Sequence, residues 1–137
     1  MRVSVDSTGQ QANERSFAAT LSTDGRYVIF NSDASNLVAD DDNNSTDVFI
    51  HDRQTGQTRR LTLVSQSNSY TPASSYAPAI SDDGRWVAFE SKAWNLVAND
   101  LNETSDIFIY DRAYYASYEV STCVYILVLR ACFKKIL

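Results

Sequence analysis

The chain has 137 residues, of which 44% are hydrophobic and 21% charged, ordinary values for a globular protein. Its net charge of −5 argues against nucleic acid as a partner, because phosphate binding requires a basic face. The longest apolar run, residues 123–129, is too short to span a bilayer, so no membrane span is expected. Residues 1–15 contain no apolar run of the kind that marks a signal peptide.

Residues 16–53 and 75–112 are two copies of one sequence. Aligned at an offset of 59 without a gap, they are identical at 21 of 38 positions, counted directly along the chain. The shared positions include Asp-Gly-Arg at 24–26 and 83–85, and Asn-Leu-Val-Ala at 36–39 and 95–98. A regular internal repeat of this length indicates a fold built from stacked, similar units.

Each unit is predicted to form four β-strands, which in the first unit cover residues 17–22, 26–32, 47–52 and 58–64. Aromatic and β-branched residues fill the second and third of these runs, and no helical period appears in residues 1–112. Asp24-Gly25 suits a tight turn between the first two strands. Nearly continuous apolar runs are typical of strands buried on both faces. The sequence therefore predicts an all-β fold.

Two motifs carry a resemblance to a known family. Residues 77–89 read Ala-Pro-Ala-Ile-Ser-Asp-Asp-Gly-Arg-Trp-Val-Ala-Phe, and residues 106–112 read Asp-Ile-Phe-Ile-Tyr-Asp-Arg. They resemble the repeat of TolB-like β-propellers, a WD40-like repeat of the PD40 type, although Ala19 stands where the family prefers Pro. The Gly-His and Trp-Asp pairs of WD-type propellers are missing. The resemblance implies a partial β-propeller of two four-stranded antiparallel blades and a periplasmic or extracellular location. It also implies a role in protein–protein contact or in carrying a separate domain.

On this interpretation the chain divides into four parts. Residues 1–15 are the outer strand of a preceding blade and its connector, 16–65 the first blade, 66–123 the second blade, and 124–137 a divergent hydrophobic tail. The pattern fails beyond Arg112, where residues 117–123 are the candidate for a divergent outer strand. Two explanations stay open for residues 113–137: a divergent or frame-shifted end, or a last strand that caps an open edge.

Binding is expected on one face of the fold. The connections between second and third strands, and from the fourth strand to the next unit, are long (residues 33–46 and 65–75) and lie at the same end of the strands. We call this end the loop face and the opposite end the turn face. Trp86 replaces Tyr27 and is expected in the core. The candidate contact residues of the loop face are Trp94, Asp40, Asp42 and Glu103.

The loop face also carries a repeated Asp-x-Asn-x-x-x-Asp element. Carboxylate and amide oxygens are ligands that Ca²⁺ prefers, which gives a calcium-binding hypothesis. Its ligands would be Asp41, Asn43, Asp47, Asp100, Asn102 and Asp106. The alternative is structural: these side chains form Asx-turns, and Asp47 and Asp106 tie the loop to the start of the third strand.

No catalytic residue or required cofactor is predicted. The only histidine, His51, has Tyr110 as its counterpart, which favours a structural role, and the chain has no Gly-x-Ser-x-Gly motif. The Asp and Arg residues of the turn face are expected to form turns and Arg–Asp bridges between adjacent blades. The leading hypothesis is a non-catalytic module that binds a protein partner, a ligand or itself through the loop face. The alternatives are a truncated or frame-shifted propeller fragment without independent function, and a calcium-dependent or carbohydrate-active propeller using paired Asp residues.

Overall fold

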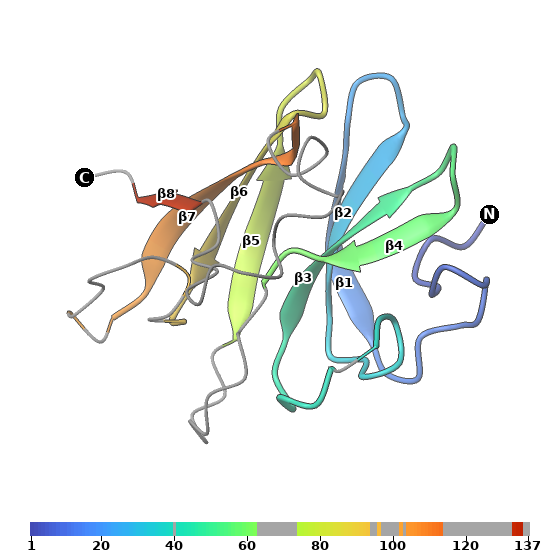
Figure 1. Ribbon diagram of the computed structural model, residues 1–137, viewed down its shortest axis with the longest axis horizontal. Coiled ribbons are helices and arrows are strands. Elements are labelled where there is room, and N and C mark those ends of the chain that lie inside the picture. Colours follow the sequence, from blue (N-terminus) through green and yellow to red (C-terminus); the bar gives the residue numbers. More distant parts are fainter. Residues whose placement is uncertain are drawn as a thin grey trace, which may run out of the picture.

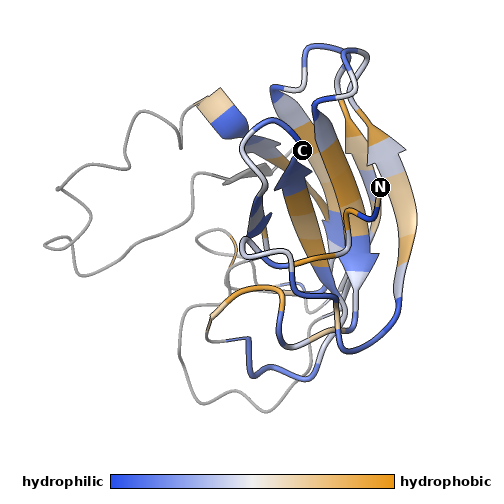
Figure 2. Cartoon of the chain, turned by 90° about the vertical axis from the view of Figure 1, so that its right-hand side faces the viewer, coloured by the Kyte–Doolittle hydropathy of each residue, from blue (hydrophilic) through white to orange (hydrophobic). Residues whose placement is uncertain are grey.

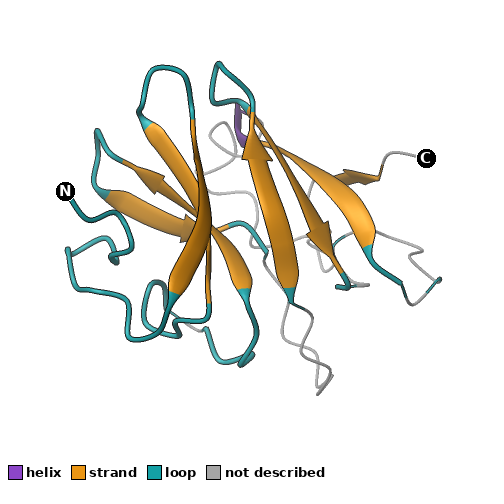
Figure 3. Cartoon of the chain, turned by 180° about the vertical axis from the view of Figure 1, so that it is seen from behind, coloured by secondary structure: helices purple, strands orange, loops and turns teal. Residues whose placement is uncertain are grey.

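A computed structural model describes residues 1–39, 41–62, 74–93, 96, 102, 104–113 and 133–135. These residues form two antiparallel β-sheets joined by loops, with one short helical turn at residues 112–113 (Figure 3). The all-β fold class is therefore confirmed. The sheets are open and stand next to each other with their faces in contact (Figure 1), an arrangement consistent with a partial propeller.

The first sheet has the strand order β1-β2-β3-β4. Its strands are β1 (Ser16–Leu21), β2 (Tyr27–Ser32), β3 (Asp47–Asp52) and β4 (Gln57–Arg60). All six residues of β2 and five of the six in β3 are buried, as their continuous apolar runs predict. Hydrophobic residues accordingly occupy the middle of these strands in Figure 2.

The second sheet repeats this order as β5-β6-β7-β8. Its strands are β5 (Ser75–Ile80), β6 (Trp86–Ser91), β7 (Asp106–Asp111) and β8 (Phe133–Lys135). The outer strand thus comes from the part assigned to the hydrophobic tail, whereas residues 117–123 lie outside the described residues. An outer strand pairs with only one neighbour through backbone groups, so sequence constrains its choice weakly.

Both units carry the same irregularity in their first strand. The pairing register shifts between Phe17 and Thr20 in β1, and between Tyr76 and Ala79 in β5. Within these bulges Ala18 and Ala77 have φ values of 51° and 50°, in the left-handed region that non-glycine residues rarely adopt. A strained feature conserved between the two copies shows that the repeat holds at the level of backbone geometry.

The Asp-Gly-Arg motif builds the turn between the first two strands. In the first unit the Asp24 carboxylate accepts hydrogen bonds from the Ser22 hydroxyl (2.6 Å) and the Arg26 backbone N–H (2.9 Å). Gly25 takes a φ of 69°, which a glycine adopts without steric cost. The equivalent hydrogen bonds recur around Asp83 in the second unit.

The two sheets pack face to face over one hydrophobic core. Alternate residues of β2 and β3 meet alternate residues of β6 and β7 across this contact, because successive side chains in a strand point to opposite faces. The first sheet contributes Tyr27, Ile29, Val48, Ile50 and Leu61, and the second contributes Val87, Phe89, Ala93, Leu96, Phe108 and Tyr110. We call the face of the first sheet that carries its set the leading face, and the face of the second sheet that carries its set the trailing face. Each sheet has one face of each kind, on opposite sides.

The trailing face of the first sheet is covered by the N-terminal segment. Val3 and Ala12 pack against the buried side chains of Val28, Phe30 and Phe49. The Thr58 hydroxyl donates to the carbonyl of Val5 (2.5 Å), which attaches this segment to β4. The N-terminal segment thus packs on the trailing face of the first sheet, as the first sheet packs on the trailing face of the second.

The leading face of the second sheet is exposed to solvent. Trp86 is 43% exposed and Ile107 52% exposed, although their counterparts Tyr27 and Val48 are buried. The expectation that Trp86 belongs to the core is therefore wrong. Its position is a core position only where a further unit covers the sheet, and no described residue does so. Separately, no helix among the described residues is long and apolar enough to cross a membrane.

Candidate binding face

The loop of the first unit is shaped by its own polar side chains. The Asn43 side-chain carbonyl accepts a hydrogen bond from the Ser45 backbone N–H (2.9 Å), and its amide donates to Asp47 Oδ2 (2.9 Å). The neighbouring Asn44 has a φ of 51°, a conformation that Asn tolerates. The loop thus contains an Asx-turn, and Asp47 joins it to the start of β3, which are the contacts expected from the structural alternative.

Arg60 lies at the centre of this loop. Its Nη1 donates to Asp41 Oδ1 (2.5 Å) and lies 3.4 Å from Asp47 Oδ2. All three side chains are nearly inaccessible, at 8%, 4% and 1% exposure for Arg60, Asp41 and Asp47. The Thr62 hydroxyl donates to the other oxygen of Asp47 (2.5 Å). The acidic pair is therefore turned inward and paired with a cation supplied by β4.

Burial changes the protonation of both carboxyl groups. It raises the pKa of Asp41 to about 6, against an ordinary value of 3.8, because desolvation outweighs the attraction of the Arg60 guanidinium. Burial also raises the pKa of Asp47, although the Thr62 hydrogen bond and Arg60 oppose the shift. One guanidinium facing two carboxylates leaves one negative charge uncompensated, and a proton on Asp41 removes it.

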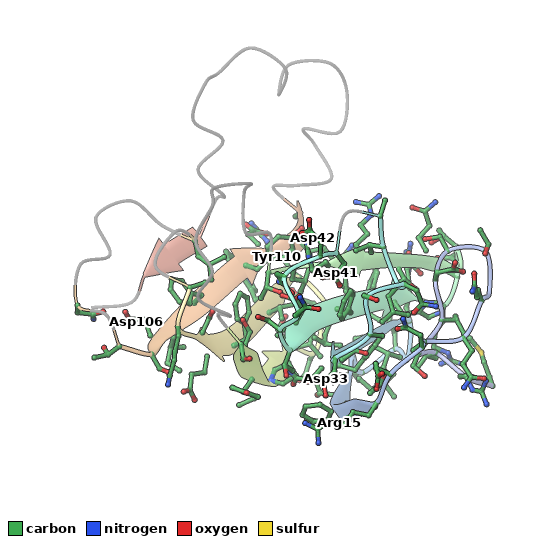
Figure 4. The ribbon with its side chains drawn as sticks, turned by 90° about the horizontal axis from the view of Figure 1, so that it is seen from below. Arg15, Asp33, Asp41, Asp42, Asp106 and Tyr110 are labelled. Atoms are coloured by element: carbon green, nitrogen blue, oxygen red, sulfur yellow. The ribbon has the colours of Figure 1, made fainter. Side chains whose placement is uncertain are left out.

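The second unit repeats the same loop contacts in part. The Asn102 amide donates to Asp106 Oδ2 (3.1 Å), and its carbonyl accepts from the Thr104 backbone N–H (3.2 Å). Figure 4, seen from the loop face, shows Asp41 and Asp42 beside the first sheet and Asp106 beside the second. Four candidates lie outside the described residues: Asp40, Trp94, Asp100 and Glu103.

The charge that the described part of the loop face presents outward is smaller than its composition suggests. Asp42 is exposed, whereas Asp33 is partly buried and accepts hydrogen bonds from the Thr46 hydroxyl (2.6 Å) and Arg15 Nε (2.5 Å). Of the carboxylates resolved on this loop, Asp42 is thus the one best placed to meet a partner.

The calcium hypothesis concerns Asp41, Asn43 and Asp47 in the first unit. Asn43 directs its amide nitrogen, not its oxygen, at Asp47, and Arg60 already contacts both carboxylates. Among the described residues, no group of three or more His, Cys, Asp or Glu side chains is arranged to hold a metal ion. Because the second-unit loop is only partly described, calcium binding stays a prediction.

Sequence reasoning missed Arg60 as the partner of this cluster. The residue lies at the end of β4 and pairs with Phe49 across the sheet, which directs its side chain to the loop end of β3. A buried acidic pair requires a nearby cation, and the first unit offers several arginines. Only the strand register shows which of them fills that role.

The Arg–Asp pairs of the turn face join strands within one unit. Arg26 donates through Nε and Nη2 to the two oxygens of Asp52 (3.0 and 2.7 Å), and Arg85 binds Asp111 in the same way (3.0 and 2.9 Å). The expectation that such pairs bridge adjacent blades is therefore wrong. Each pair connects the second strand of a unit to its third, because these strands lie side by side in one sheet.

His51 has a structural environment. It is 2% exposed, and its Nδ1 lies 2.9 Å from the Thr58 hydroxyl on the neighbouring strand. Burial lowers the pKa of its imidazole. A buried, neutral histidine bonded to a threonine packs the sheet and offers no accessible base.

A shallow hollow of about 420 Å³ lies between residues 6–8 of the N-terminal segment, residues 36–39 and Thr58. The carboxylate of Asp6 at its rim accepts hydrogen bonds from the backbone of Thr8 and Gln10 (both 2.8 Å). That carboxylate stabilises its own turn, so the hollow presents mainly small apolar groups and hydroxyls.

These features define an all-β protein built from two similar four-stranded antiparallel units. No protein-family model matches the chain, and no curated protein matches it either.

Proposed function

We propose that the chain is a non-catalytic β-propeller repeat module of the TolB-like type, which binds a basic protein segment through the loop face. The Asp-Gly-Arg turns and the paired four-stranded units support the family assignment. The turn at residues 22–26 differs from its copy at 81–85 at one position, whereas the loop at residues 33–46 differs from its copy at 92–105 at seven of fourteen positions. Variable loops on a constant scaffold are a common arrangement for recognition.

The observation that carries this proposal is the network of side-chain contacts within the first loop. Asn43 bonds to Asp47 and to the Ser45 backbone N–H, Arg60 contacts Asp47 with little exposure to water, and Asp42 next to this network is exposed. A preorganised loop loses little conformational entropy on binding. Its exposed carboxylate favours a partner rich in Lys or Arg.

The module is proposed to be non-catalytic because the described candidates for catalysis have structural roles. His51 is buried against Thr58, and the carboxylates of Asp41 and Asp52 bind Arg60 and Arg26 respectively. Turnover of any glycan in a substrate panel, lost in Asp41→Asn, would contradict this part of the proposal.

Binding is tested with a ten-residue polylysine peptide and isothermal titration calorimetry at low and moderate salt. We expect salt-sensitive binding that Asp42→Asn weakens severalfold, because the lost charge is on the contact surface. Asp82→Asn makes the same charge change at an exposed position of the turn face and serves as the matched control. Equal weakening by both variants would show a non-specific charge effect and overturn the assignment to the loop face.

A further inference from the structure

The contact between the two units centres on the ring of Tyr27. This ring lies between two guanidinium groups: Arg26 of its own unit, 4.8 Å from the ring centroid, and Arg112 of the second unit, at 3.8 Å. Gly84 of the second unit also contacts this ring, so closely that a Cβ at this position would lie 2.7 Å from Tyr27 Cδ2. The leading face of one unit therefore receives a glycine and an arginine from the trailing side of the next.

Trp86 occupies the same position on the second unit with only half of this environment. Arg85 lies over its ring at 4.6 Å, as Arg26 lies over Tyr27. No described residue takes the place that Arg112 takes on Tyr27, and Trp86 is 43% exposed. Ile107, which pairs with Glu90 at the loop end of β6, is 52% exposed, so both ends of this face present exposed apolar side chains.

The matching half of this contact is exposed at the turn end of the first unit. The counterparts of Ile80, Gly84 and Arg112 are Leu21, Gly25 and Arg53. Ile80 packs on the core between the sheets, whereas Leu21 is 54% exposed. Arg53 donates to the Gly25 carbonyl (2.6 Å) as Arg112 donates to that of Gly84 (2.7 Å), but the side chain of Arg53 is exposed.

The chain thus exposes both halves of an interface that it already forms once internally. We propose that the leading face of the second unit docks a second copy of this chain, with Trp86 of one copy against Leu21, Gly25 and Arg53 of the next. In this arrangement the guanidinium of Arg53 in one copy lies over the ring of Trp86 in the other, as Arg112 lies over the ring of Tyr27. This surface lies on the side of the sheets, away from Asp42, and is independent of the loop-face proposal.

The docking is head-to-tail, because the two surfaces that meet are different parts of the chain. Such an association closes into a ring or continues as a chain of copies, depending on the rotation between neighbours. The N-terminal segment covers the part of the trailing face formed by Phe30 and Phe49. Contact is therefore concentrated at the turn end, and we expect a modest, concentration-dependent association.

Sedimentation equilibrium of the full chain, from about 10 µM to about 500 µM, tests the proposal through two variants. Trp86→Glu removes the leading surface, and Arg53→Glu removes the trailing one. Each variant alone is expected to associate at least tenfold more weakly than the unaltered chain. Mixed in equal amounts, they retain one intact pair of surfaces and are expected to form a dimer containing one copy of each.

Lys92→Glu, at an exposed position outside both surfaces, controls for the added negative charge and should associate as the unaltered chain does. Circular dichroism confirms that the variants fold. Three results would overturn the proposal: a monomeric unaltered chain at every concentration; self-association that Trp86→Glu abolishes but Arg53→Glu leaves intact, as expected for a symmetric contact between leading faces; or a mixture of the variants that stays monomeric.

Discussion

Gly84 lies against the ring of Tyr27, so closely that a Cβ on the glycine would be 2.7 Å from Tyr27 Cδ2. This contact joins the turn of the second unit to the second strand of the first. The turn therefore requires glycine for two reasons: Gly84 has a φ of 71°, and it lies against an aromatic ring of the neighbouring sheet.

Gly84→Ala is expected to lower the free energy of unfolding by about 2–4 kcal/mol, because the new methyl group both strains the backbone and pushes Tyr27 away. Gly56→Ala is the matched control, since Gly56 has a φ of 75° but no atom within 4 Å of the added Cβ. It should cost only about 1 kcal/mol. Urea denaturation measures both, and equal losses would show that the contact with Tyr27 contributes nothing.

Arg60→Met is expected to destabilise the fold by about 3–5 kcal/mol at pH 7, because it leaves the buried carboxylates of Asp41 and Asp47 without their cation. The loss should shrink at pH 4.5, where a carboxyl of raised pKa is protonated. Arg15→Met removes the exposed pair with Asp33 and should cost much less, because water screens this pair. Similar losses in the two variants would contradict a buried ion pair.

Asp41 also predicts a pH dependence of stability. Its pKa is raised from 3.8 to about 6 in the folded chain, so the folded state holds this proton more tightly than the unfolded state does. The stabilisation linked to the proton is complete below about pH 4 and is lost as the pH rises through 6. Asp41→Asn should remove a change of about 1–3 kcal/mol between pH 4.5 and 7. Urea denaturation at both pH values measures it, and an unchanged pH dependence would contradict the assignment.

The response to calcium separates the two accounts of the first loop. Calcium binding predicts a rise in melting temperature with millimolar Ca²⁺ that EDTA reverses. We expect no rise from the first loop, since Arg60 already pairs with Asp41 and Asp47 and the Asn43 amide nitrogen faces Asp47. A reversible shift that Asp41→Asn abolishes would contradict the Arg60 account and support a metal site.

Much of the fold could be predicted from the sequence, because its signals are local. Apolar runs predict the positions of β2 and β3, and Asp24-Gly25 predicts the turn before β2. The 59-residue offset predicts that a second sheet repeats the first. Each of these features depends on residues close together in the chain.

The contacts that depend on three-dimensional context were harder to predict. Trp86 aligns with a core residue but is exposed, because burial of that position depends on a neighbouring unit. Arg60 reaches Asp41 across the sheet, and only the strand register shows this. Arg26 binds Asp52 within its own unit, because β2 and β3 are adjacent strands of one sheet and place the two residues side by side.

The central claim is that the two repeats pack as consecutive units, and a disulfide between them tests it most directly. The Thr23 backbone N–H donates to the Asp82 carbonyl (3.2 Å), so these positions of different units lie close enough for a bridge. Thr23→Cys and Asp82→Cys, in a chain with Cys123 and Cys132 replaced by Ser, should form a bridge within one molecule on oxidation at low concentration. Mass spectrometry of non-reduced peptides detects it. Free thiols at both positions, or bridges between molecules alone, would contradict the arrangement.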